Sequence, residues 1–191
     1  MTARSARDST PQPHSRGRAR VILASLSAFG LTALGWASFV SPLPRFVYNP
    51  SDSVAVGWYR VDPHTRDPAA PRVGSLVLVP LPAAAATLAA RRGYLPPGIP
   101  LLKPVAAVAP QRVCASGGVV RIGGVRVAAA LRTDGWGRPL QAWSQCRRLR
   151  PGELFLLSRT NPASFDSRYF GPVHASAVLG VAHLVWQEAR R

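Results

Sequence analysis

The hydrophobic pattern of the chain begins with one long apolar run. Residues Val21 to Val40 form twenty consecutive positions without a charged side chain. At about 1.5 Å of rise per residue, a helix of this length spans about 30 Å, which is the thickness of a bilayer core. Pro42 and Pro44 follow the run, and proline cannot continue a helix. The pattern therefore predicts a transmembrane helix over residues 21–40.

The charges on either side of this run predict its orientation. Only Arg45 follows the run closely, whereas five arginines precede it: Arg4, Arg7, Arg16, Arg18 and Arg20. The positive-inside rule then places residues 1–20 in the cytoplasm, as a disordered basic tail, and residues 41–191 outside it. A cleaved signal peptide is the alternative. The run is longer than a usual signal core, and no clear small-x-small site follows it, so an uncleaved single-pass anchor is favoured.

Beyond residue 45 the apolar stretches are short and are separated by turns. Nineteen prolines and sixteen glycines argue against a helical bundle and for many short strands. Strands are expected at 73–79, 101–109, 113–122, 125–130, 153–157 and 173–186, with one or two turns of helix within 83–92. Gly123-Gly124 is a hairpin signal between two of these runs. The predicted fold class is mainly β.

The net charge of +16 adds little to this picture. Lys103 is the only lysine among 24 cationic residues, so the other 23 are arginine. The arginines are scattered, and no zinc finger, basic zipper or RNA-binding signature accompanies them. We therefore expect no direct nucleic-acid binding. Attraction to acidic membrane lipid explains the charge equally well.

The two cysteines, Cys114 and Cys146, both lie in the part of the chain assigned to the outside. An oxidising compartment favours a disulfide between them. A metal site is not expected, because no histidine lies near either cysteine at a ligand spacing. We expect no cofactor.

Candidate chemistry lies first at Ser53 and Lys103. Ser53 stands shortly after the apolar run, in a stretch with Ser51 and Gly57. A serine hydroxyl is a weak nucleophile and needs a base. Lys103 stands inside an apolar segment, where a lysine either reaches to water from an edge strand or lowers its pKa. Lysine, unlike arginine, can lose its proton in a protein and so can act as a base.

A third stretch, Ser164 to Pro172, completes an ordered set: a serine after a membrane anchor, a lysine in an apolar strand, and a Ser-x-Asp-Ser-Arg-Tyr-x-Gly loop. In this order the three resemble the type I signal peptidase superfamily, and most closely its TraF-type conjugative-transfer peptidases. The resemblance covers roughly residues 45–187. Its further matches are Asn49…Ser53…Gly57-x-Tyr59 and Leu102-Lys103-Pro104.

The resemblance implies an antiparallel, barrel-like β domain with a serine–lysine dyad. Ser53 would be the nucleophile and Lys103 the general base. The hydroxyl of Ser51 and the backbone N–H of Ser53 would form the oxyanion hole.

The supporting residues are implied in the same way. Ser164 matches the residue that orients the lysine amine, and Asp166 and Arg168 match a structural ion pair. Two positions depart from the pattern. Ala55 stands where proline is usual, and Ser75 stands where a Gly-Asp pair is common.

The sequence thus predicts a membrane-anchored serine endopeptidase that processes a secreted precursor after a small residue. By resemblance the precursor is a conjugative pilin subunit, the partners are membrane lipid and the transfer machinery, and the domain is periplasmic on a bacterial inner membrane. Some TraF-type systems couple cleavage to pilin cyclisation, and the sequence leaves both outcomes open. The alternatives are a general signal peptidase and a non-catalytic component of a type IV secretion complex.

Overall fold

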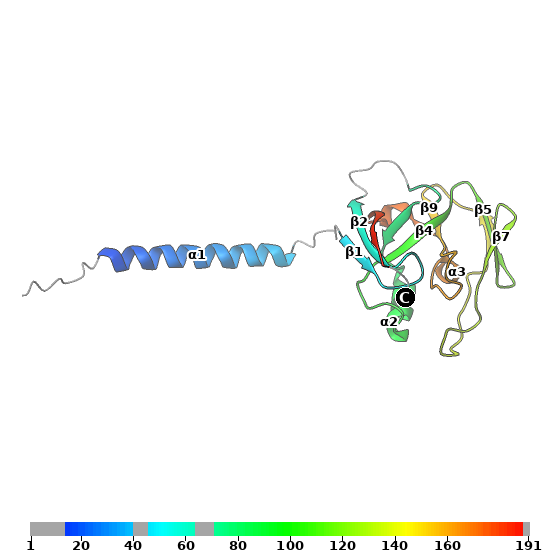
Figure 1. The fold of residues 1–191 in the computed structure, drawn as a ribbon, viewed down its shortest axis with the longest axis horizontal. Helices are drawn as coiled ribbons and strands as arrows, with labels where there is room; N and C mark the ends of the chain where they lie inside the picture. Colours follow the sequence, from blue (N-terminus) through cyan, green and yellow to red (C-terminus); the bar gives the residue numbers. More distant parts are fainter. Residues whose placement is uncertain (1–13, 40–45, 64–70, 189–191) are drawn as a thin grey trace, which may run out of the picture. The chain divides into compact units, whose positions relative to one another are not determined.

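The computed structural model describes residues 14–39, 46–63 and 71–188. The chain divides into two units, Met1–Pro42 and Leu43–Arg191. The second unit carries the candidate chemistry, and Figure 1 shows its strands and short helices.

The first unit contains the helix α1, His14–Phe39. Its segment Gly17–Trp36 is long and apolar enough to cross a membrane. The expected helix therefore exists but begins earlier, and disorder was the wrong prediction for residues 14–20, which are helical. Arginine is a good helix former, so Arg18 and Arg20 can extend the apolar helix by two turns. Val40 and residues 1–13 lie outside the described residues.

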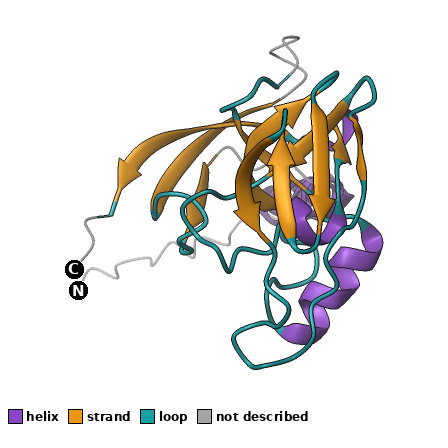
Figure 2. Cartoon of the chain, turned by 90° about the vertical axis from the view of Figure 1, so that its right-hand side faces the viewer, coloured by secondary structure: helices purple, strands orange, loops and turns teal. Residues whose placement is uncertain are grey.

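The second unit consists of two antiparallel sheets, which confirms the mainly β fold class. The order of strands is β1-β2-β11-β3-β4-β9-β10 in the larger sheet and β7-β6-β5-β8 in the smaller. The larger sheet curls like half of a barrel (Figure 2). The helices and strands are β1 (Phe46–Asn49), β2 (Gly57–Pro63), β3 (Leu76–Val79), α2 (Ala83–Arg92), β4 (Leu101–Val108), β5 (Arg112–Ser116), β6 (Val119–Ile122), β7 (Val125–Ala129), β8 (Cys146–Arg148), β9 (Glu153–Leu156), α3 (Ser167–Phe170), β10 (Val173–His174), a 3-10 turn (Ala175–Ala177) and β11 (Gly180–Gln187).

The central strands of the larger sheet are buried on both faces. In β3, Val77 belongs to one hydrophobic cluster and its neighbour Leu78 to another. In β9, Leu156 packs with Val77, whereas Phe155 faces a third cluster beneath the smaller sheet. Successive side chains of a strand point to opposite faces, so a strand between two cores must be apolar at every position. This arrangement explains why apolar and polar residues do not alternate along these strands.

Two of the predicted strands are divided in the structure. The run 113–122 forms β5 and β6, which are joined at Gly117 and Gly118. Both glycines have positive φ, 59° and 78°, as a two-residue hairpin turn of type I′ requires. The run 173–186 is interrupted by the 3-10 turn before β11. The predicted hairpin at Gly123-Gly124 joins β6 to β7.

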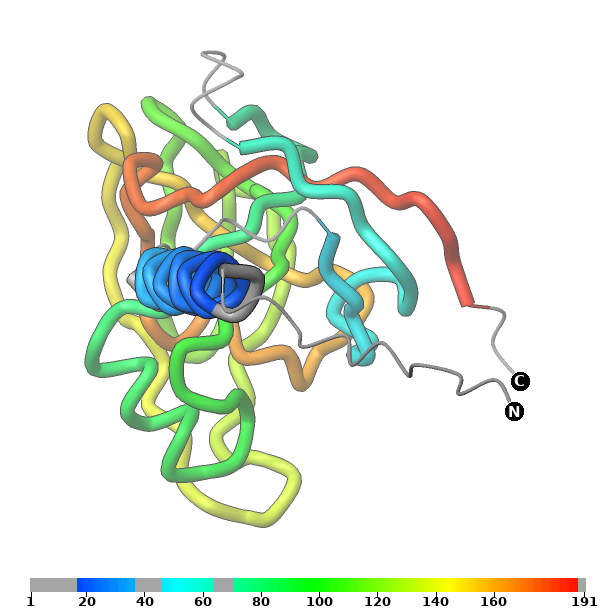
Figure 3. Tube along the Cα trace, turned by 90° about the vertical axis from the view of Figure 1, so that its left-hand side faces the viewer, coloured from blue at the N-terminus to red at the C-terminus, as the bar shows by residue number. Residues whose placement is uncertain are grey.

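The C-terminal strand β11 runs along β2, next to the candidate nucleophile loop (Figure 3). Gly57, the first residue of β2, has a φ of 151° and lies against the backbone of β11. A Cβ atom at this position would stand 2.1 Å from the carbonyl oxygen of Trp186. Only glycine allows the two strands to approach so closely.

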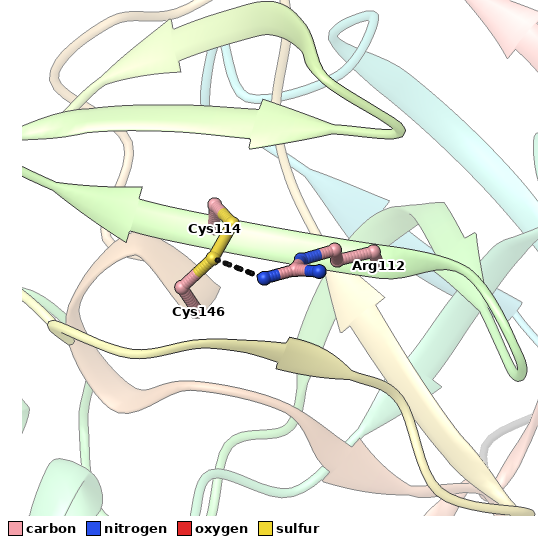
Figure 4. Close-up of a disulfide and its surroundings, with 3 residues drawn as sticks. All are labelled: Arg112, Cys114 and Cys146. Carbon is pink, nitrogen blue, oxygen red and sulfur yellow. Dashed lines mark hydrogen bonds between the residues drawn. A yellow bond between two sulfur atoms is a disulfide. The ribbon is translucent and has the colours of Figure 1, made fainter.

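A disulfide joins Cys114 of β5 to Cys146 of β8, as the sequence predicts (Figure 4). The two residues lie directly opposite each other in the antiparallel register. The Arg112 guanidinium donates a long hydrogen bond, 3.5 Å, to the Cys146 sulfur. The disulfide fastens the short strand β8 to β5 at the edge of the smaller sheet.

Candidate active site

The loop that carries Ser53 is organised by Asn49, the last residue of β1. The Asn49 side chain is buried, and its Nδ2 donates to the carbonyl oxygens of Ser51 (2.7 Å), Ala55 (3.1 Å) and Val54 (3.3 Å). A single amide thus folds residues 50–55 around itself. The carbonyl of Ala55 also accepts the Tyr59 hydroxyl at 2.6 Å. The turn is therefore fixed at the position where the family pattern would have proline.

The same loop is held from the far side of the chain. Ser158, two residues after β9, is buried and donates its hydroxyl to the carbonyl oxygen of Ser53 at 2.6 Å. Thr160 donates to the carbonyl oxygen of Asp52 at 3.0 Å. These contacts span more than a hundred residues of sequence and fix the backbone of Ser53 against the central sheet.

The hydrogen bonds of Ser51 determine the direction in which the Ser53 hydroxyl donates. The Ser51 hydroxyl oxygen lies 2.9 Å from Asn49 Oδ1 and 2.9 Å from Ser53 Oγ. The amide oxygen can only accept, so the one proton of Ser51 goes to Asn49. Ser53 must then donate to Ser51 Oγ. The Ser53 proton therefore points to Ser51, within the same loop.

Lys103 lies on β4, between β3 and β9, in the interior of the larger sheet. It is 4% exposed, so the alternative of a lysine that reaches to water from an edge strand is wrong. Its Nζ donates to Ser164 Oγ at 2.7 Å. Burial lowers the pKa of Lys103 to about 8; the nearby Asp166 carboxylate raises it and the Arg168 guanidinium lowers it, and both effects are smaller than that of burial. A neutral amine is thus accessible near physiological pH.

Asp166 and Arg168 form a fully buried ion pair behind Ser164. Two parallel hydrogen bonds join them, Nε to Oδ1 and Nη2 to Oδ2, each 2.8 Å long. Asp166 also caps α3 by accepting the backbone N–H of Arg168 and accepts the backbone N–H of Ser158. Bidentate geometry of this kind suits arginine and not lysine.

The remaining donors of Arg168 hold the loop that presents Ser164. Its Nη1 donates to the carbonyl oxygen of Pro162 at 2.8 Å, and its Nη2 donates to those of Asn161 and Ser164, each at 3.1 Å. The guanidinium therefore fixes the backbone of Ser164, whose hydroxyl in turn receives the lysine. Arg168 thus contacts the backbone of Ser164, and neither Asp166 nor Arg168 is among the residues that line the cleft described next.

The predicted residues meet at one cleft of about 560 Å³, which Ser51, Ser53, Lys103 and Ser164 all line. Among the hydrogen bonds of the described residues, none joins Ser53 Oγ to Lys103 Nζ; Ser53 Oγ pairs with Ser51 Oγ, and Lys103 Nζ donates to Ser164 Oγ. Catalytic hydrogen bonds are often long without substrate and shorten when it binds. The arrangement suits nucleophilic attack by a serine that a neutral amine deprotonates.

Sequence reasoning missed several residues around this cleft. Asn49 and Ser158 position the loop of Ser53, and Tyr94, Asp134 and Trp136 line the cleft as well. Asn49 could have been found from its match to the family spacing, but the other contacts depend on folding. In the described part of the chain, no group of three or more His, Cys, Asp or Glu side chains gathers to hold a metal ion.

Comparison with known proteins identifies the class that this fold and cleft define. The model of the family "Signal peptidase, peptidase S26" matches residues 18–187, and the chain belongs to that family. A solved signal peptidase I from Enterococcus faecalis V583 is 21% identical, with a TM-score of 0.36 over 58% of this chain and 95% of that one.

The chain is also similar in sequence to proteins named for conjugal or plasmid transfer. It is 36% identical to a "Probable conjugal transfer protein TraF" of Sinorhizobium fredii (strain NBRC 101917 / NGR234), over 89% of this chain and 92% of the relative. It is 35% identical to a "Conjugal transfer protein TraF" of Agrobacterium fabrum (strain C58 / ATCC 33970), over 87% and 96%. A "Plasmid transfer protein TraF" of Escherichia coli is 28% identical over 85% and 91%.

Proposed function

We propose that the protein is a membrane-anchored serine endopeptidase in which Ser53 and Lys103 form the catalytic dyad. One observation carries the proposal: the only lysine of the chain is buried, has a pKa of about 8 and lines the same cleft as Ser53. A buried cation without function would be costly, whereas a general base needs a pKa near the working pH. The membership of the signal peptidase family supports the same reaction class.

In the proposed reaction the neutral amine of Lys103 takes the proton of Ser53 Oγ, which attacks the carbonyl carbon of the scissile peptide bond. The backbone N–H of Ser53 and the hydroxyl of Ser51 stabilise the oxyanion. The Ser51 hydroxyl donates to Asn49 Oδ1, with 2.9 Å between the two oxygen atoms, so it must rotate to donate to the oxyanion. Donors of this kind contribute about a hundredfold to a thousandfold to kcat.

The second half of the reaction restores the enzyme. The Lys103 ammonium gives its proton to the leaving amine, and the precursor segment remains as an ester on Ser53. Lys103 then deprotonates a water molecule, which attacks the ester carbonyl. The bond to Ser53 Oγ breaks, the Lys103 ammonium returns its proton to Ser53 Oγ, and the acid leaves and ionises to a carboxylate. If the amino terminus of the substrate attacks in place of water, a new peptide bond closes a ring. Ser164 keeps the lysine amine oriented in both halves.

The substrate that we propose is a secreted precursor of the conjugation apparatus, a pilin subunit cut after a small residue. The relatives named for conjugal and plasmid transfer support a peptidase-like role in conjugation and work beside the transfer machinery. The helix Gly17–Trp36 would hold the enzyme on the inner membrane, with the catalytic unit in the periplasm.

The test replaces the proposed base without removing its charge. Lys103→Arg should abolish cleavage while the protein stays folded and abundant, because guanidinium cannot take the Ser53 proton. Ser53→Ala should cause the same loss, and the double variant no further loss, since dyad members act as one unit. Mass spectrometry of the precursor with each variant measures this. Near-normal cleavage by Lys103→Arg would refute the dyad, and an uncut precursor with the wild type would favour a non-catalytic component.

A further inference from the structure

A loop that lines the same cleft as the candidate dyad is fastened to the end of α2 by one carboxylate. Asp134 lies in the loop Leu131–Leu140, forty residues from Tyr94 in sequence, and its Oδ2 accepts the Tyr94 hydroxyl. The same oxygen accepts Arg138 Nε at 2.7 Å. Its Oδ1 accepts the backbone N–H groups of Arg138 (2.9 Å) and Trp136 (3.0 Å). We call Tyr94, Asp134, Trp136 and Arg138 the latch.

The carboxylate of the latch is not an ordinary surface acid. Its side chain is 5% exposed, and Arg92 lies within 3.8 Å as a second cation. Burial raises the pKa of Asp134, but the hydrogen bonds from Tyr94, Arg138 and Trp136 outweigh burial and hold the pKa well below its usual range. The group is therefore ionised at any pH at which the protein works, and all of its visible contacts hold segments together.

The latch arranges aromatic rings along the cleft. The Tyr94 and Trp136 rings are stacked at 6.3 Å, and the Arg138 guanidinium lies 4.7 Å above Trp136 and 5.5 Å above Tyr94. Trp136 is nevertheless 71% exposed, so its stacking orients a ring that solvent can reach. Figure 3 shows the segment after α2 and the loop 131–140 side by side.

The latch also reaches the dyad side of the cleft. The ring centroids of Tyr94 and Phe165 lie 5.3 Å apart. Phe165 directly follows Ser164, which accepts the hydrogen bond of Lys103. Tyr94, Asp134, Trp136 and Phe165 line the same cleft as Ser53. The loop is further held at its base, where the Leu131 N–H donates to the Tyr169 hydroxyl at 3.0 Å.

We propose that Asp134 is a positioning residue that holds the Tyr94 and Trp136 rings as an apolar shelf for the precursor segment next to the scissile bond. The inference rests on the proposed peptidase function. The shelf fits an extended peptide with apolar side chains, because its exposed surface is aromatic and both nearby guanidinium groups, Arg138 and Arg92, are paired with Asp134.

The latch predicts a change in substrate binding and not in chemistry. In Asp134→Asn the amide keeps one oxygen for the backbone N–H groups but loses the charge that Arg138 and Tyr94 share. We expect KM for a peptide spanning the cleavage site to rise about tenfold, with kcat within about twofold of the wild type. Tyr94→Phe, which keeps the ring, should reproduce the effect, and the double variant should be no worse than either single variant. Asp62→Asn removes a carboxylate from an exposed ion pair with Arg60 and is the matched control.

Trp136→Ala keeps the test valid if Asp134→Asn does not fold, because it removes an exposed ring and leaves the backbone N–H bond to Asp134 intact. It should also raise KM about tenfold. An unchanged KM in a folded Trp136→Ala variant overturns the proposal. So does a fall in kcat alone in Asp134→Asn, since that result would place the effect at Ser164 and Lys103.

A binding measurement separates this inference from the proposed function. In the Ser53→Ala background, the peptide should bind about tenfold more weakly when Asp134→Asn is added, by titration calorimetry. Equal binding refutes the latch even if the wild type cleaves the precursor. Weaker binding supports the latch even if cleavage by the wild type is never observed.

Discussion

The rate of cleavage should follow the titration of Lys103. With a pKa of about 8 the amine is neutral in about a tenth of molecules at pH 7, half at pH 8 and nearly all at pH 9.5. Only the neutral amine can accept the Ser53 proton. We therefore expect kcat/KM to rise about tenfold between pH 7 and pH 9.5 and then to reach a plateau. A lysine at its ordinary pKa of 10.5 would give a rate that still climbs tenfold per pH unit at pH 9.

The same pKa predicts how stability changes with pH. A shift from 10.5 to about 8 corresponds to about 3 kcal/mol, which the folded protein loses by burying the ammonium. The folded pKa is lower than the unfolded one, so between pH 8 and pH 10.5 the unfolded chain binds more protons, and stability rises with pH in that window. Lys103→Met should therefore stabilise the protein below pH 8 by up to about 3 kcal/mol, less the lost bond to Ser164, and the gain should fade toward pH 10.5.

The assay uses the full chain in detergent or lipid and a peptide that spans the cleavage site, under conditions that report kcat/KM. Circular dichroism at each pH confirms that the protein stays folded, and urea unfolding of the wild type and Lys103→Met measures the stability difference. A rate that is flat from pH 6 to pH 10, or one without a plateau, would refute Lys103 as a base with a lowered pKa.

Two further predictions concern the support of the site and the topology. Asp166→Ala should lower the free energy of unfolding by about 3–5 kcal/mol in urea, because it leaves the Arg168 guanidinium, 1% exposed, without its carboxylate. Asp62→Ala, in an exposed pair, should cost less than about 1 kcal/mol, and equal losses would argue against the buried pair as the brace. Alkaline phosphatase fused after residue 60 should be active and a cytoplasmic reporter there inactive; the reverse result would overturn the orientation.

Sequence predicts best those parts of the site in which the local composition leaves few physical alternatives. Lys103 is one charge in an apolar strand, so either an edge position or a lowered pKa had to follow, and only its neighbours β3 and β9 decide between the two. The apolar runs predicted strands because their composition is β-forming. Gly117-Gly118 carries the same turn signal as Gly123-Gly124, and treating 113–122 as one strand overlooked it.

The parts that sequence does not predict are contacts between distant segments. Asp134 reads as a loop acid, since nothing near it in sequence predicts a tyrosine forty residues earlier as its partner. Ser158 is predicted only as the first residue of a polar loop, and its bond to the carbonyl of Ser53 exists only because β9 and the loop after β1 meet in the fold. Asn49 was visible as a match to a spacing, but its role depends on three carbonyl groups that the loop turns toward it.

The chain of hydroxyl groups from Ser53 through Ser51 to Asn49 gives the proposed enzyme a resting state. In that state the Ser53 hydroxyl donates to Ser51 and the Ser51 hydroxyl donates to Asn49, so neither proton is given to Lys103 or to a substrate carbonyl. Both groups must turn before reaction, and a bound precursor supplies the carbonyl group that draws them round. The proposed peptidase would therefore be inactive until a substrate carbonyl group enters the cleft.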